Sequence, residues 1–326
     1  MTRIIVTGGA GYIGSHTAKR LAHYGIETAV FDNLSRGHRD FVKWGPLIEG
    51  DLRNTALLRE TLRWFKPDVI LHFAAFAYVG ESFSNPGIYY DNNVGGTVSL
   101  LQAMHESGID KIVVSSSCAT YGQPDHLPIT EDMPLRPINP YGKSKLMMEQ
   151  ICGDFEKAHG LRFVSLRYFN ACGGDPDGEI GERHDPEPHL IPRLFMAQDG
   201  EIDALDIMGD DYPTPDGTCI RDYIHVNDLA EAHIKAAHYL LNGGPSDAFN
   251  LGTGRGVSVR EVIETAAQVT GKAVPHRVSP RRDGDPAALV ADASKARRIL
   301  DWTAGNSDMA AVLESAWTWH KKERQK

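Results

Sequence analysis

The sequence predicts an α/β fold in which helices cover both faces of a parallel sheet, followed by a smaller α/β domain. In the first half, apolar strand-like runs alternate with amphipathic helical segments, which is the pattern of repeated βα units. The first strand runs directly into a glycine-rich turn. After residue 170 the pattern is less regular. We therefore expect one domain over 1–169 and a second mainly over 170–326, with a segment near 222–251 returning to the sheet.

Each element follows from local signals. Strands are expected at 3–7, 28–31, 47–50, 69–73, 112–114, 162–166 and 248–251. Helices are expected from the glycine turn to about residue 24, and over 55–65, 86–107, 140–159 and 227–241. Pro86 and Pro140 lie where helices begin, and Asn227 is the expected N-cap of its helix. Ser258 and Glu261 have the spacing of a capping box that opens a further helix. Residues 170–189 are rich in Gly, Pro and Asp and predict a long loop over the site.

Composition excludes several classes of protein. The chain has 326 residues, 41% hydrophobic and 24% charged, as expected for a soluble globular protein of about two domains. Its net charge of -9, without a long Lys/Arg run, argues against a nucleic-acid partner. No apolar run approaches the roughly 20 residues that span a bilayer, and the start lacks a signal-peptide pattern. Four scattered cysteines without a CxxC pair predict reduced thiols and a cytoplasmic location.

The glycine-rich turn predicts a nucleotide site. Gly8, Gly11 and Gly14 fit a GxxGxxG spacing, and the run from Gly9 to Gly14 also fits GxGxxG. Glycines let the backbone turn tightly and approach a pyrophosphate, whose charge then lies at a helix N-terminus. Asp32 ends the second strand, where a carboxylate accepts hydrogen bonds from a ribose 2′-hydroxyl and repels a 2′-phosphate. Together these features predict a Rossmann-type dinucleotide site that favours NAD over NADP.

The stretch from Pro140 to Lys145 carries the candidate reaction groups. Tyr141 and Lys145 are four residues apart, so they share one face of a helix. Lowering the pKa of a tyrosine from near 10 by roughly three units requires about 4 kcal/mol, which a fixed cation nearby can supply. Such a pair on its own is more often structural. Here, however, Ser117 ends a strand at the edge of the sheet where ligands bind, so we expect the three side chains to converge.

Further motifs occur in order along the chain. They are TGGAGYIG (7–14), DNL (32–34), GDL (50–52), HFAA (72–75), NN (92–93), SSSCATYG (115–122), PYGKSK (140–145), LRYFN (166–170), GDDYPTPDGTCIRDYIHV (209–226) and RRDGD (281–285). In this combination the chain resembles the extended short-chain dehydrogenase/reductase family, and within it the UDP-glucose 4-epimerases. The resemblance runs from about residue 2 to residue 302.

The resemblance implies roles for the matching residues. Tyr141 would be the catalytic base and acid, Lys145 would hold the nicotinamide ribose and lower the pKa of Tyr141, and Ser117 would hydrogen-bond the reacting hydroxyl. With Tyr141 and Lys145, the residues implied for NAD binding are Gly8, Gly11, Tyr12, Ile13, Gly14, Asp32, Asn33, Asp51, Leu52, Phe73, Ala74, Ala75, Asn92, Ser115 and Tyr168. With Ser117 and Tyr141, those implied for the substrate are Asn170, His189, Leu190, Met208, Arg221, Tyr223, Arg282, Asp285 and Leu289.

Two of these residues also make physical sense, and three positions depart from the pattern. Arg221 and Arg282 can clamp a diphosphate through charge-assisted hydrogen bonds. Ala77 stands where many members carry a lysine near the cofactor, and Ala119 stands where threonine is frequent. Leu289 matches the residue on the far wall of the sugar pocket; its intermediate size leaves acceptance of N-acetylated sugars open.

The implied activity is reversible epimerisation at C4 of UDP-galactose and UDP-glucose through a 4-keto intermediate, with tightly bound NAD as transient hydride acceptor. A 4-epimerase of UDP-xylose/UDP-arabinose, a UDP-N-acetylhexosamine or UDP-glucuronate is the alternative. A nucleotide-sugar dehydratase is disfavoured, because Cys118-Ala119 follows Ser117 where dehydratases place an Asp-Glu pair. A non-catalytic NAD-sensing protein need not keep Ser117, Tyr141 and Lys145 together.

Two expectations concern metals and assembly. His72, His225 and His238 have no ligand spacing with Cys or Asp, so no metal is expected. The helices at 86–107 and 140–159 carry apolar residues on an outward face, among them Met147. The resemblance implies that these helices form a homodimer interface.

Overall fold

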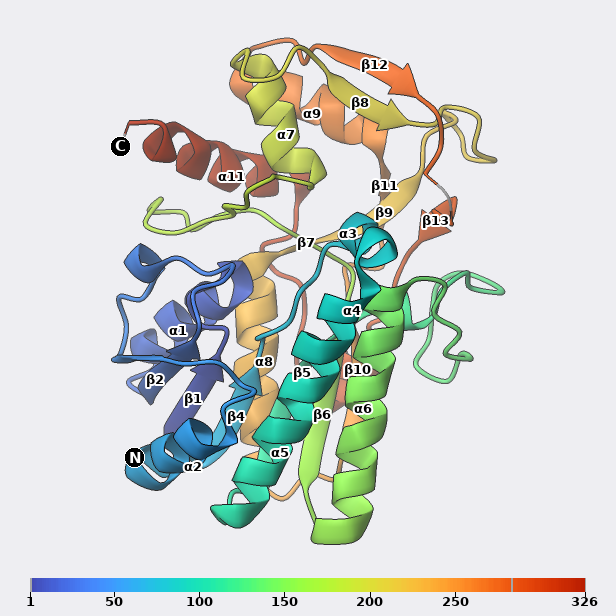
Figure 1. Cartoon of the computed structure of the whole chain (residues 1–326). Helices are drawn as coiled ribbons and strands as arrows, with labels where there is room; N and C mark the ends of the chain where they lie inside the picture. The colour runs from blue at the N-terminus through green and yellow to red at the C-terminus, as the bar shows by residue number, and fades with distance from the viewer. Residues whose placement is uncertain (1, 283, 326) are drawn as a thin grey trace.

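A seven-stranded parallel sheet forms the centre of the larger part of the molecule, as seen in the computed structural model, which describes residues 2–282 and 284–325 (Figure 1). Its strand order is β10-β6-β5-β4-β1-β2-β3. The strands are β1 (Arg3–Thr7), β2 (Glu27–Asp32), β3 (Leu47–Glu49), β4 (Val69–His72), β5 (Lys111–Ser117), β6 (Arg162–Tyr168) and β10 (Asp247–Leu251). The predicted fold class, a doubly wound sheet with a smaller α/β part after it, is confirmed.

Helices cover both faces of this sheet. On one face lie α1 (Tyr12–His23), α8 (Val226–Leu241) and α10 (Ser294–Leu300); on the other lie α2 (Thr55–Phe65), α5 (Gly96–Glu106) and α6 (Pro140–His159). The apolar run of β1 explains why the sheet is buried on both sides. Ile4 and Val6 belong to the core under α1 and α8, whereas Ile5 belongs to the core under α2 and α5.

The smaller part of the molecule lies at the carboxyl ends of these strands (Figure 1). It contains β9 (Ile220–His225), which pairs with β7 (Asn170–Cys172), β11 (Gly256–Ser258) and β13 (Ala288–Leu289), and a separate pair of β8 (Leu205–Met208) with β12 (His276–Ser279). Helices α7 (Leu190–Gln198), α9 (Val259–Thr270) and α11 (Met309–Glu323) share its apolar core. After β9 the chain returns to the large sheet through α8 and β10.

Two local expectations change. The helix expected over 86–107 is divided into α4 (Pro86–Tyr89), a π-helical segment (Tyr90–Gly95) and α5. The expected N-cap Asn227 is wrong: α8 begins at Val226, and the His225 ring accepts a hydrogen bond from the Asn227 amide at 3.0 Å. The capping box at Ser258 and Glu261 is confirmed, with both reciprocal hydrogen bonds formed. Within the described ranges, no helix is long and apolar enough to cross a membrane.

Candidate active site

One cavity of about 1450 Å³ lies between the carboxyl edge of the large sheet and the smaller domain. Sites for one drug-sized ligand are typically about 300–1,000 Å³, so this cavity has room for two adjacent ligands. Every residue predicted for catalysis, cofactor or substrate lines it, with the exception of Asp51. Asp51 instead has its carboxylate held by the Asn33 amide at 2.9 Å and by the Arg53 guanidinium. Asp283, within the RRDGD motif, lies outside the described residues.

The glycine turn is shaped for close approach of a phosphate. Gly8 has φ +73°, and a Cβ there would lie 2.6 Å from the Ala74 amide nitrogen. A Cβ on Gly14 would lie 2.3 Å from the Gly8 carbonyl oxygen, so the start of α1 packs directly on the turn. By contrast, a Cβ on Gly11 would meet only the Gly8 oxygen, at 3.3 Å, and would otherwise project into the cavity. The two glycines whose Cβ would clash, Gly8 and Gly14, belong to the GxxGxxG spacing. Gly11 leaves open space beside the N-terminus of α1, and this cradle fits a pyrophosphate.

Asp32 lies beside this turn at the end of β2. Its carboxylate accepts hydrogen bonds from the Ala10 amide at 3.0 Å and the Leu34 amide at 2.8 Å. Burial raises the pKa of Asp32, although these two backbone hydrogen bonds and His38 oppose the shift. The carboxylate therefore both fixes the glycine turn and presents an acceptor toward the cavity, as a ribose hydroxyl requires.

The reaction groups meet where β5 ends and α6 begins. The β5–β6 register places Ser117 opposite Tyr168, and the Asn139 side chain caps α6 by accepting from the Gly142 amide at 2.7 Å. A Cβ on Gly142 would lie 2.4 Å from the Ala119 oxygen, so the first turn of α6 packs against the turn after Ser117. This packing brings the Tyr141 phenol close enough to the Ser117 hydroxyl for the two groups to interact.

Lys145 lies one turn further along α6 and is buried. Its ammonium donates a 2.7 Å hydrogen bond to the Ser115 carbonyl oxygen and lies 6.0 Å from the centre of the Tyr141 ring. The Ser115 hydroxyl is itself hydrogen-bonded to the Tyr168 hydroxyl. Ser117, Tyr141 and Lys145 therefore lie close together, as expected, with Ser115 and Tyr168 beside them on the strand side; their catalytic roles remain predictions.

Burial dominates the electrostatics of these groups. Burial raises the pKa of Tyr141 to about 12, opposed by its hydrogen bond with Ser117. Burial also lowers the pKa of Lys145 to about 7, opposed by the charge of Glu149. In the protein without bound ligands, the neutral form of each group is therefore more favoured than it is in water. That Lys145 lowers the pKa of Tyr141 remains a prediction.

The opposite wall of the cavity carries the predicted substrate residues. The Arg221 guanidinium on β9 forms an ion pair with Asp285 and is almost fully buried. Leu289 on β13 pairs in register with Arg221 on β9, so the expected sugar wall adjoins the expected diphosphate clamp. β9 and β13 are far apart in sequence, so the spacing of their residues along the chain does not reveal that they are neighbours.

Several cavity residues were missed by the sequence reasoning. Arg36 lies 5.0 and 4.8 Å from the ring centres of Phe76 and Tyr78, and its guanidinium is 2.6 Å from a Glu81 oxygen. Its position four residues after Asp32, past the DNL motif, is a sequence signal for this location. The charge of Arg36 is compensated by Glu81, so this arginine is not free to bind a 2′-phosphate beside Asp32.

A second missed group lines the same cavity. Glu182 and His184 precede the predicted residue His189, and all three face the cavity. Burial lowers the pKa of His189, but the Glu182 and Glu187 carboxylates outweigh burial and raise the pKa to about 10. The sequence signal for this group is the close spacing of acids and histidines over 182–189.

Comparisons with known proteins identify the family. The NAD dependent epimerase/dehydratase family matches residues 4–252. The chain is 51% identical over 322 residues to the UDP-glucose 4-epimerase of Rhizobium meliloti (strain 1021), covering 99% of this chain and 98% of that protein. The crystal structure of UDP-glucose 4-epimerase from Brucella ovis in complex with NAD superposes with a TM-score of 0.96 and 51% identity, covering 98% and 99% of the two chains. The Bifidobacterium longum enzyme in complex with NAD+ and UDP gives a TM-score of 0.93 and 39% identity over 99% of each chain.

These matches extend over nearly the whole chain, and they confirm the resemblance inferred from the motifs. The glycine cradle, Asp32 and the Ser117–Tyr141–Lys145 cluster all lie within the matched residues 4–252. The chain belongs to the NAD dependent epimerase/dehydratase family.

Proposed function

We propose that this protein is a UDP-glucose 4-epimerase, which interconverts UDP-galactose and UDP-glucose by inverting C4. The observation that carries the proposal is the shared cavity. The dinucleotide cradle lies on one side, Ser117, Tyr141 and Lys145 lie at its centre, and the Arg221–Asp285 wall lies on the other. A hydride acceptor and a nucleotide sugar can therefore lie against the same three side chains. The relatives of known structure, in complex with NAD or with NAD+ and UDP, support this reading.

The cofactor side fits NAD. Gly8, Gly11 and Gly14 would hold the pyrophosphate at the start of α1, and Asp32 would accept from the adenosine ribose. Lys145 would bind the nicotinamide ribose. NAD+ supplies a transient acceptor for the C4 hydride of the sugar, so the reaction proceeds without net oxidation.

Tyr141 moves the proton. Its hydroxyl lies against Ser117, and Ser117 in turn accepts a 3.1 Å hydrogen bond from the Ala119 amide. We propose that the Tyr141 phenolate takes the proton of the sugar 4-hydroxyl while Ser117 holds that hydroxyl in place. The flat 4-keto sugar then turns within the pocket, and Tyr141 returns the proton after the opposite face of C4 has been presented.

The nucleotide end of the substrate must stay fixed during that turn. Arg221 and Arg282 would hold the diphosphate, and the Arg221–Asp285 ion pair pre-positions one guanidinium. Asn170, His189, Leu190, Met208 and Tyr223 complete the proposed substrate wall. Such anchoring restricts the motion to the hexose ring, which allows C4 to present both faces to the same hydride acceptor.

The sugar range is the part of the proposal that Leu289 decides. A 4-epimerase of UDP-xylose/UDP-arabinose, a UDP-N-acetylhexosamine or UDP-glucuronate would use the same proton and hydride chemistry. The dehydratase alternative lacks its acid pair, since Cys118 and Ala119 follow Ser117. UDP-galactose/UDP-glucose is our first choice because relatives named UDP-glucose 4-epimerase match nearly the whole chain, while the intermediate size of Leu289 leaves N-acetylated sugars open.

The experiment is a panel of UDP-sugars offered to purified protein without added NAD, with products separated by chromatography. We expect UDP-galactose and UDP-glucose to interconvert, with no NADH released into solution. Conversion of UDP-xylose but not UDP-galactose would reject the first choice while keeping the mechanism. Activity only with added NAD, with net reduction of it, would reject the epimerase.

We also propose a cytoplasmic homodimer. Val98 on α5 and Met147 on α6 are both more than a third exposed, and these helices lie side by side on one face of the sheet (Figure 1). Pairing of two such faces would bury them in a four-helix interface. The four cysteines are all free, which accords with a reducing compartment. Sedimentation at a monomer mass would reject the dimer.

A further inference from the structure

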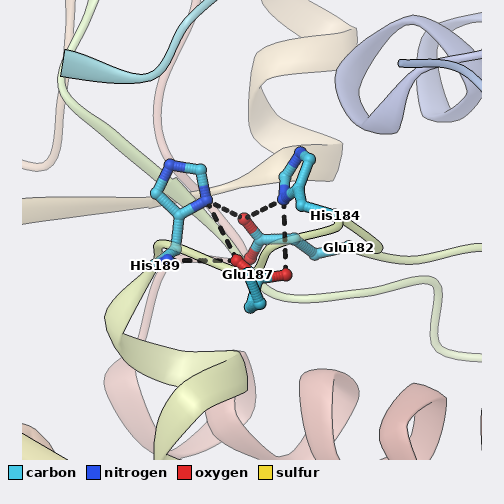
Figure 2. A group of neighbouring side chains, drawn as sticks. All are labelled: Glu182, His184, Glu187 and His189. Carbon is cyan, nitrogen blue, oxygen red and sulfur yellow. Dashed lines mark hydrogen bonds and ion pairs between the residues drawn. The ribbon is translucent and has the colours of Figure 1, made fainter. Parts of the chain in front are cut away.

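Four side chains between β7 and α7 point toward a common centre (Figure 2). They are Glu182, His184, Glu187 and His189, and His189 is the N-cap residue of α7. One donor atom from each, Nδ1 of the two histidines and a carboxylate oxygen of the two glutamates, lies within 4.8 Å of all the others. Each carboxylate belongs to a side chain that is 7% exposed, so little of either glutamate reaches the outer surface.

Three of the four separations between a histidine Nδ1 and a glutamate oxygen are longer than a good hydrogen bond, and two of them involve different oxygens of Glu187. His184 Nδ1 lies 3.5 Å from Glu182 Oε1 and 3.4 Å from Glu187 Oε2, and His189 Nδ1 lies 3.4 Å from Glu187 Oε1. Ligands placed 2.0–2.1 Å from a tetrahedral Zn²⁺ lie roughly 3.3 Å apart. The fourth separation, 2.6 Å between His189 Nδ1 and Glu182 Oε1, would lengthen by about 0.7 Å on metal binding.

The ring of His184 is poorly satisfied by the two carboxylates that it faces. Its Nδ1 atom is buried and makes no hydrogen bond, although two carboxylates face it. A buried polar atom without a partner is costly, and a shared cation would satisfy it and both carboxylates together. The acidic group of Asp175, Asp177 and Glu179 makes a useful contrast. There the Lys19 ammonium already contacts all three carboxylates, at 2.8, 3.2 and 2.6 Å.

We propose that Glu182, His184, Glu187 and His189 form a binding site for one divalent transition metal of the zinc class. Two imidazole nitrogens and two carboxylate oxygens suit Zn²⁺ and similar borderline ions, whereas Mg²⁺ and Ca²⁺ prefer oxygen ligands alone. Groups outside the four side chains also orient these ligands. The His189 amide donates a 3.0 Å hydrogen bond to Glu187 Oε1, and the Tyr78 ring lies edge-on to His184 at 5.4 Å.

The site has a structural consequence. Four protein ligands close the coordination shell of Zn²⁺, so the ion would be structural and would not take part in the hydride chemistry. It would tie the loop before α7 to the first turn of that helix, where His189 and Leu190 line the cavity. It would also neutralise two carboxylates placed beside a cavity proposed to hold anionic nucleotides. The site stands independently of the reaction assigned to the protein.

The test uses full-length protein with any affinity tag removed, stripped by dialysis against a chelator and titrated with Zn²⁺ alone in a calorimeter. We expect one saturable site per chain and a rise in Tm with added Zn²⁺. His184→Ala and Glu187→Gln should each weaken binding by more than about 100-fold, since loss of an outer-shell partner alone typically costs 10–100-fold. His23→Gln, which removes an exposed histidine of α1, should bind like the wild type.

A second readout keeps the proposal open to refutation if a variant folds poorly. Co²⁺ added to the stripped wild type should give the visible absorption bands of a four-coordinate site, and Zn²⁺ should abolish them by displacement. Absence of saturable Zn²⁺ binding in the wild type would overturn the proposal. So would equal binding by the wild type and by both cluster variants that circular dichroism shows to be folded.

Discussion

Replacing Tyr141 by phenylalanine separates the chemistry of the site from its stability. Loss of a positioned proton-transfer group typically costs about 10²–10⁴-fold in rate, which corresponds to about 2.7–5.5 kcal/mol of transition-state stabilisation. The structural cost should be far smaller. Phenylalanine fills the same buried space, and Ser117 keeps its hydrogen bond from the Ala119 amide at 3.1 Å. Loss of the phenol hydroxyl should therefore lower the free energy of unfolding by only about 0.5–1.5 kcal/mol.

The assay measures kcat for UDP-galactose, binding of UDP and urea unfolding in the same preparation. Tyr141→Phe should lose kcat by at least about 100-fold, bind UDP within a few-fold of the wild type and remain folded. Tyr121→Phe is the matched control. Tyr121 is buried and hydrogen-bonded to Asn250 and Arg167 but does not line the cavity, so its loss should cost stability and spare kcat. Near-wild-type turnover in Tyr141→Phe would refute the assignment of the proton-transfer group.

Three further predictions follow from buried or lining residues. Burial lowers the pKa of His72 to about 3, below the value near 6.5 that it has in the unfolded chain. The folded protein keeps this ring neutral, so its free energy of unfolding falls as pH drops from about 6.5 toward 3. His72→Gln should reduce the slope of the urea-unfolding free energy against pH in that window by up to about 1.4 kcal/mol per pH unit. Asp32→Ala removes the acceptor of two backbone amides and of the proposed ribose contact, so NAD released on denaturation should fall at least about 10-fold, and unchanged NAD content would contradict the site. Leu289→Tyr should lower kcat/KM for a UDP-N-acetylhexosamine relative to UDP-galactose by about 10-fold or more and Leu289→Ala should raise it, whereas an unchanged ratio would place the specificity wall elsewhere.

Local sequence was a good guide wherever one segment determines its own structure. The glycine turn, the strand ending at Asp32 and the helix carrying Tyr141 and Lys145 follow from short-range sterics and capping, and their positions were predicted correctly. The N-cap of α8 failed because His225 and Asn227 are both able to cap, and the fold of β9 decides between them. The Glu182–His189 group was missed for a related reason. The close spacing of acids and histidines over 182–189 signals the group, but its donors converge only because the loop folds back on the start of α7.

The charge balance at Tyr141 shows what the protein does and does not supply for catalysis. Burial, opposed by the neighbouring Ser117, raises the pKa of this phenol to about 12. A charged Lys145, whose Nζ lies 6.0 Å from the centre of the Tyr141 ring, would lower this pKa by charge attraction. Burial also lowers the pKa of Lys145 to about 7, so the lysine is not fully charged at neutral pH. Further stabilisation of the phenolate would have to come with the ligands, and the positive charge of a bound nicotinamide ring would contribute to it. Tyr141 should therefore become a base only in the loaded site, which confines proton abstraction to the moment when a sugar is in place.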